Sequence, residues 1–108
     1  MSRGRKKDNG SGRTGATGLV MRLFIAGQGP NSVQAVANIE AICRQYFDHT
    51  HSLEIIDTLE DPLRALADGV LITPTLIKVS PKPVMKVVGN LSAKSAVLLA
   101  LGLKEKLG

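Results

Sequence analysis

The chain has 108 residues, of which 44% are hydrophobic and 21% are charged. This length fits one domain, and the balance is typical of a globular protein rather than a disordered or membrane-embedded one. No apolar run approaches the roughly 18–20 residues of a spanning helix, and no apolar segment follows the basic start, so we expect a cytoplasmic protein without a signal peptide or membrane anchor. The single cysteine, Cys43, excludes an internal disulfide framework.

The formal net charge of +5 is concentrated in residues 1–19, which hold five basic side chains and one acidic one. This segment also has five glycines and almost no apolar content. We therefore predict a flexible, basic, Gly-rich tail at 1–19, a folded domain at 20–104 and a short C-terminal end at 105–108. Such a tail either binds polyanions weakly or is a dispensable extension. Because the folded part is nearly neutral, we favour the second interpretation and expect no nucleic-acid binding.

The first half of the domain alternates strand-like and helix-like patterns. An apolar run at 20–26 predicts a buried strand, and Asn31 is predicted to cap a helix that ends near residue 48. Residues 53–59 predict a second strand, and residues 62–68 a short helix between Asp61 and Gly69. The apolar stripe predicted for the first helix contains Val33, Val36, Ile39, Cys43 and Tyr46, with Ala37, Ile42 and Phe47 beside them.

The second half reads as two strands and a helix. A third strand is predicted at 70–72 and 75–79, interrupted by Pro74, and a fourth at 84–88 after a proline-rich turn. Ser92 is predicted to cap a last helix whose inward side chains are Ala96, Val97, Leu99, Ala100, Leu101 and Leu103.

The order β-α-β-α-β-β-α predicts an α/β fold of the thioredoxin-like type. The first two strands are joined by a helix and should be parallel, whereas the last two are joined by a tight turn and should be antiparallel. In such folds a cis proline commonly opens the third strand. Pro74 stands at that place, and the element order favours a cis proline over an ordinary trans one.

The chemistry of a redox enzyme is missing from this pattern. Thioredoxin-like redox enzymes carry cysteines in the loop after the first strand, where the helix N-terminus stabilises a thiolate. Here that loop, residues 27–32, has no cysteine, and Cys43 lies about three turns further along the helix on its apolar stripe. We therefore predict that the protein is not a thiol–disulfide enzyme.

Two further patterns are weak indications of a metal site and of a dinucleotide site. His49 and His51, with the carboxylate of Asp48 adjacent, could bind a transition metal, but an isolated His-x-His in a polar loop lacks the full set of protein ligands that tight binding needs. Residues 27–29 resemble part of a dinucleotide-binding loop, without its third glycine or acidic ribose partner. We predict solvated histidines and neither a metal nor a cofactor.

A set of short motifs extends from about Met21 to Leu103, each weak alone and specific together. They are Ala26-Gly27 with Pro30-Asn31-Ser32-Val33, Ile56-Asp57 with Asp61-Pro62, Thr73-Pro74-Thr75-Leu76, Pro81 with Pro83-Val84, and Gly89-Asn90-Leu91-Ser92. Through these motifs the sequence resembles the KaiB family of circadian clock proteins.

The resemblance implies a non-enzymatic regulator that binds a KaiC-type, RecA-like ATPase ring and modulates circadian or stress-linked signalling. It also implies two forms: a thioredoxin-like form that binds the partner, and a resting form, usually tetrameric, in which the second half of the chain folds differently. The partner-bound form competes with a thioredoxin-like sensor domain of a histidine kinase. The alternative function is a KaiB-like stress-response module with a different protein partner, and a homo-oligomer, either dimer or tetramer, is compatible with both.

The family's binding mode places the partner site on the second strand and the short helix after it. The residues expected there are Glu54, Asp57, Leu59, Arg64, Ala67 and Gly69. Family members commonly carry lysine at the positions of Glu54 and Gly69, so the electrostatic match to a partner differs here.

Four residues are expected to set the fold: Pro74, Gly89, Ala100 and Gly102. Relatives carry glycine at position 100, so Ala100 favours the last helix, and Gly102 falls where glycine ends a helix well. We therefore expect the thioredoxin-like form to be more populated than in typical relatives.

Overall fold

The computed structural model describes residues 18–47 and 51–103. The elements are β1 (Leu19–Ile25), α1 (Pro30–Tyr46), β2 (His51–Asp57), α2 (Pro62–Ala67), β3 (Thr75–Ser80), β4 (Met85–Val88) and α3 (Lys94–Ala100). This is the predicted order of elements. Residues 1–17, His49 and residues 104–108 lie outside the described residues. Within the part described, no helix has the length and apolar character needed to cross a membrane.

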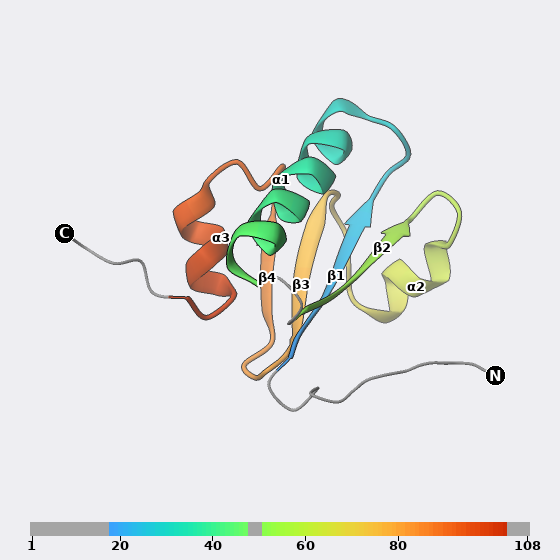
Figure 1. Cartoon of the computed structure of the whole chain (residues 1–108). Coiled ribbons are helices and arrows are strands. Elements are labelled where there is room, and N and C mark those ends of the chain that lie inside the picture. The colour runs from blue at the N-terminus through green and yellow to red at the C-terminus, as the bar shows by residue number, and fades with distance from the viewer. Residues whose placement is uncertain (1–17, 48–50, 104–108) are drawn as a thin grey trace.

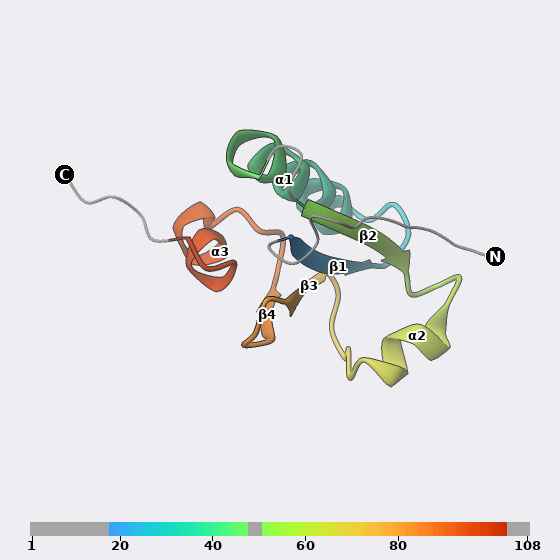
Figure 2. The ribbon, with the colours of Figure 1, turned by 60° about the horizontal axis from the view of Figure 1, so that its bottom comes forward.

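The four strands form one sheet in the order β2-β1-β3-β4. Strand β1 is parallel to β2 and antiparallel to β3, and β3 and β4 form an antiparallel hairpin. The predicted strand directions are therefore confirmed. Helices α1 and α3 lie on one face of the sheet and α2 lies on the other (Figures 1 and 2).

The two faces of the sheet bury very different amounts of apolar surface. The face under α2 packs a small cluster of Phe24, Ile56, Ala65, Val70 and Ile77. The face under α1 and α3 packs a larger cluster, which consists of Leu19, Met21, Leu23, Ile25, Ala35, Ile39, Ile42, Cys43, Leu76, Leu91, Val97, Leu98 and Leu101. The core of the domain therefore sits between the sheet and α1 and α3.

The predicted apolar stripes of α1 and α3 are partly wrong. In α1, Val33, Ala37 and Tyr46 are exposed, and in α3 Ala96 and Leu99 are exposed whereas Leu98 is buried. A helical stripe read from sequence is wider than the line along which a helix meets a sheet. Tertiary packing selects the part of the stripe that becomes buried.

The predicted caps of the same two helices are also wrong. Helix α1 begins after Gly29, not Asn31, and Pro30 occupies its first turn. Helix α3 begins after Ala93, because the backbone N–H of Ser92 donates to the Asn90 side chain in a turn before the helix.

The strand boundaries differ from prediction in all four strands. Strand β4 begins at Met85, one residue after the predicted start. Strand β1 begins at Leu19, one residue before the predicted domain start, because this side chain is part of the core. Strand β2 spans His51–Asp57 instead of 53–59. Residues 70–72 do not join β3, because the backbone N–H of Val70 donates to the carbonyl of Ala65 and completes the end of α2.

The residues expected to set the fold occupy special backbone positions. The Thr73-Pro74 bond is cis, as predicted, and the Pro74 carbonyl accepts a 2.9 Å hydrogen bond from the N–H of Gly89. Gly102 has a φ of 97° just after α3, and the N–H of Leu103 donates to the carbonyl of Leu98 at 2.8 Å. This is the hydrogen bond of a Schellman motif, and it confirms that α3, with Ala100 buried in its last turn, ends at the predicted glycine.

Candidate partner-binding surface

Asp57 organises the turn between β2 and α2. Its carboxylate oxygen Oδ1 accepts hydrogen bonds from the N–H of Gly27 at 3.1 Å and of Leu59 at 2.9 Å. The N–H of Thr58 also donates to the carbonyl of Ile25 at 2.8 Å. Asp57 therefore holds the ends of β1 and β2 together and fixes the direction in which Leu59 leaves the sheet.

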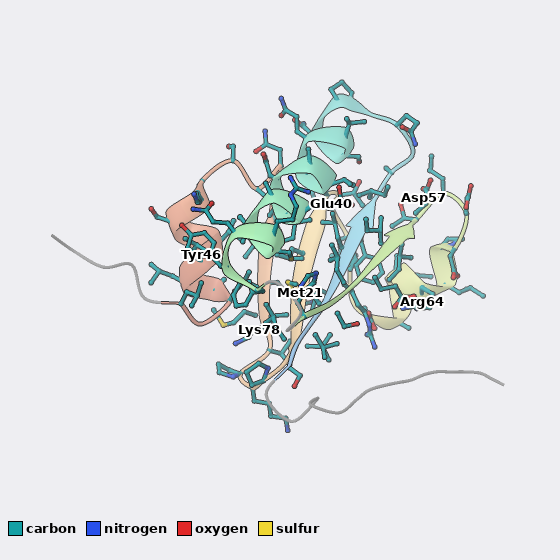
Figure 3. All side chains as sticks on the ribbon, viewed as in Figure 1. Met21, Glu40, Tyr46, Asp57, Arg64 and Lys78 are labelled. Atoms are coloured by element: carbon teal, nitrogen blue, oxygen red, sulfur yellow. The ribbon has the colours of Figure 1, made fainter. Side chains whose placement is uncertain are left out.

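Glu54 and Arg64, both predicted to face a partner, bind each other. The Arg64 guanidinium donates two hydrogen bonds of 2.9 Å to the Glu54 carboxylate, from α2 to β2. This bond lowers the pKa of Glu54 and raises that of Arg64. Figure 3 shows Arg64 on α2 and Asp57 at the end of β2, on the same side of the molecule. The side chains stay substantially exposed, so the pair stabilises the fold only modestly.

A second ion pair on this side was not predicted from the sequence. Arg22 of β1 donates to Asp68 at 2.8 Å, and Lys86 of β4 donates to the carbonyl of the same aspartate at 3.3 Å. The residues of the ion pair are 46 positions apart. No local pattern could reveal a contact that depends on the order of the strands.

Gly69, also part of the predicted site, follows the C-terminal end of α2. Its φ is 71°, and its N–H donates to the carbonyl of Leu66 at 3.0 Å. This left-handed conformation is strained for residues with a Cβ atom. The structure therefore gives Gly69 a conformational role, and its contact with a partner stays a prediction.

The outer side of α2 and its two flanking segments carry large exposed apolar side chains. The exposed fractions are 72% for Leu59, 75% for Leu63, 68% for Leu66, 89% for Leu71 and 60% for Ile72. We call these five residues the α2 surface, and Ala67 is exposed at the end of the same helix. Contiguous exposed apolar side chains are typical of interaction surfaces for proteins, membranes or ligands, which makes this surface the candidate site.

Of the α2 surface, the sequence prediction found Leu59 and missed the other four residues. Their spacing carries a signal, since positions 59, 63 and 66 recur at helical intervals. The same signal predicts a buried stripe equally well. The structure shows that Ala65 turns toward the sheet and that the leucines turn away from it.

A hollow of about 190 Å³ lies next to the α2 surface, at the N-terminus of α1. A Cβ atom on Gly27, which lines the hollow, would lie 3.1 Å from Leu59 Cδ1. The lining is mainly apolar, and the buried Ser32 hydroxyl already accepts a hydrogen bond from the N–H of Ala26. The hollow therefore suits an apolar side chain of a partner.

The cysteine chemistry of a redox enzyme has no counterpart at this position. Cys43 is buried in α1 away from the hollow, and burial, with a smaller effect of Glu40, raises the pKa of its thiol to about 11. A thiol with a raised pKa is a poor nucleophile. Among the described residues, no three His, Cys, Asp or Glu side chains are grouped as ligands for a metal ion.

The sheet order and the placement of the helices define the chain as a thioredoxin-like domain. The N-terminal domain of Synechococcus elongatus SasA is similar to it, with a TM-score of 0.67 and 22% identity over 91% of this chain and 96% of that chain. Chloroplastic thioredoxin z is also similar, with a TM-score of 0.66 and 17% identity over 78% of this chain and 76% of that chain. These likenesses show the fold.

The sequence comparison then assigns the family. The KaiB domain profile matches residues 22–103. The circadian clock oscillator protein KaiB of Gloeothece citriformis is 44% identical over 84 residues, which cover 78% of this chain and 79% of that protein. The corresponding protein of Nostoc punctiforme is 43% identical over 78% of this chain and 81% of its own length. The chain belongs to the KaiB family, as the resemblance predicted.

Proposed function

We propose that this chain is a non-enzymatic regulatory protein that binds a KaiC-type, RecA-like ATPase ring through the α2 surface. Membership of the KaiB family, whose relatives are named as circadian clock proteins, supports the class of function. The observation that carries the location is the exposure of the five large apolar side chains of the α2 surface. Covering them by a partner removes apolar area from water and so favours association.

Regulation then follows from differential binding. A protein without catalytic groups changes the behaviour of an ATPase by binding one of its conformations more tightly than another. The hydrogen bonds of Asp57 and the Glu54–Arg64 pair contribute by fixing the position of α2 before the partner arrives. A preorganised surface loses less entropy on binding than a mobile one.

Two features favour the alternative, a stress-response module with another protein partner. Glu54 is acidic and Gly69 is neutral at positions where family members commonly carry lysine. Recovery of a defined partner other than a RecA-like ATPase by the purified chain, from native lysate, would support this alternative.

The test of the main proposal mixes the chain with the RecA-like ATPase from the same organism and measures the mass and affinity of the complex. The informative variant is the double swap Glu54→Lys with Arg64→Glu. Because these residues pair with each other, the swap keeps the internal ion pair and the net charge while it inverts the charges presented to a partner.

We expect the swap to weaken association, chiefly through a slower association rate. The control is Lys82→Glu in the exposed turn between β3 and β4, which should leave the affinity unchanged. Unchanged affinity of the swap at low salt would place the interface elsewhere. Absence of any complex with the ATPase would contradict the proposed function itself.

A further inference from the structure

The charges around the α2 surface are distributed unevenly. Ion pairs among the described residues neutralise Glu54 with Arg64 and Asp68 with Arg22. Lys86 also donates to the carbonyl of Asp68, so the three cations Arg22, Arg64 and Lys86 contact Glu54 or Asp68. Three acidic residues of the turn that leads into α2 are left outside these ion pairs: Asp57, Glu60 and Asp61.

These acidic residues lie beside the apolar part of the same surface. Leu59 is flanked by them in sequence, and Leu63 follows Asp61 by two positions in the first turn of α2. Leu59 also lies against Gly27, which lines the hollow at the N-terminus of α1, with the exposed Val33 on the same lining. The corner of the molecule thus combines an apolar contact area, a hollow and an acidic turn.

We propose that the α2 surface binds a basic protein segment that presents apolar side chains, with one of them seated in the hollow beside Gly27. The proposal deepens the proposed function, because it rests on the same surface and specifies the charge of what binds there. Lysine or arginine side chains of the partner meet Glu60 and Asp61 at the rim, while apolar side chains cover the leucines.

Three other molecules or segments that could cover the α2 surface are disfavoured. A second copy in a symmetric contact would bring two acidic turns together, and this repulsion disfavours a dimer through α2. The chain's own residues 1–17 are basic but have no large apolar side chain beyond Met1, so they cannot cover the leucines. Nucleic acid is repelled by the acidic turn.

The test uses two synthetic amphipathic helical peptides with leucine at the same positions. One peptide has lysine and the other glutamate at the remaining polar positions. Each is titrated into the full-length chain at low salt and followed by the backbone amide signals in NMR spectra. We expect the lysine peptide to bind roughly tenfold more tightly, with shifts centred on Leu59, Leu63 and Leu66, and to bind less tightly as salt rises.

Two variants separate the apolar from the ionic contribution. Leu63→Ser keeps every charge, and Glu60→Lys with Asp61→Lys keeps every leucine; each is expected to weaken lysine-peptide binding by roughly fivefold or more. All three positions are exposed, so the folded spectrum should be retained. The matched control, Val88→Ser on the exposed edge strand β4, should bind as the wild type does.

Equal affinity for the two peptides would overturn the proposal, and so would shifts confined to β4. A dimer that dissociates on Leu63→Ser would identify a second copy as the occupant and would overturn it as well. No ATPase is present in this titration. Its failure therefore leaves the ATPase proposal standing, and failure of the ATPase to bind leaves this result unaffected.

Discussion

The two faces of the sheet do different work. The face under α1 and α3 buries thirteen side chains in one cluster, whereas the face under α2 buries five and leaves five large apolar side chains exposed beside them. Figure 2 shows the asymmetry, with α2 alone on its side of the sheet. The first face holds most of the core, and the second holds a short helix whose outer side stays exposed.

The face under α2 buries few side chains, so polar contacts also help to position this helix. A helix of six residues is too short to be stable by itself. Ion pairs attach α2 to β2 through Arg64 and attach the residue after it to β1 through Arg22. Because ion pairs help to hold α2 in place, its leucines need not be buried to position the helix. They stay exposed on its outer side.

The largest expected effect separates the two faces directly. Ile39→Ala removes a fully buried side chain of α1 and should lower the free energy of unfolding by about 2–5 kcal/mol. Leu66→Ala on the α2 surface should change it by no more than about 0.5 kcal/mol, because that side chain is already in water. Chemical denaturation of both variants measures the difference, and similar losses would show that the α2 surface is packed.

The next effect concerns the glycines that follow α2 and α3, one on each face of the sheet. Helices α2 and α3 each end at a glycine with positive φ, at Gly69 and Gly102. Replacing either by alanine should lower the free energy of unfolding by about 1–2 kcal/mol, because the left-handed backbone is strained once a Cβ is present. Gly29→Ala is the control, since its φ of −59° is ordinary for alanine and a smaller loss is expected. Denaturant unfolding of the three variants compares them.

A smaller effect is expected from a substitution in α3, which tests how strongly this helix favours the thioredoxin-like form. Ala100→Gly lowers helix propensity by about 0.5–1 kcal/mol and should shift the balance away from the thioredoxin-like form by roughly two- to fivefold. Backbone chemical shifts across 92–101 report the helix, and light scattering reports the mass. A stable tetramer with extended shifts there, unaltered by the substitution, would contradict the expectation.

The smallest effect comes from the Glu54–Arg64 pair on the α2 side. Its double-mutant cycle with alanine should give a coupling of about 0.2–1 kcal/mol, because both side chains are substantially exposed. The pKa of Glu54 is lowered by folding, so the contribution is present above the ordinary value of 4.5 and is lost as the pH falls through the lowered pKa. Urea unfolding at several pH values measures the coupling free energy. A coupling that grows on acidification would show that the ionised Glu54 carboxylate is not its source.

Local patterns were sufficient for the order of elements. Strand and helix periods, Asp61-Pro62 before α2, and the glycines after α2 and α3 act over a few residues, and the structure agrees with each of them. The strand directions followed because a helical connection and a tight turn impose opposite geometries. The absence of cysteine from residues 27–32 is likewise a property of the sequence alone.

Partnerships between distant residues were decided by the tertiary structure. Six residues were predicted to meet a partner, which stays a prediction. The sequence did not show that Glu54 and Arg64 also bind each other, that Asp57 also binds the turn, or that Gly69 has a positive φ. Leu63 and Leu66 were missed because an apolar residue at helical spacing is equally compatible with burial and exposure. Periodicity determines which side chains share a side of a helix. The assembled sheet determines which side it covers, because burial depends on what lies opposite.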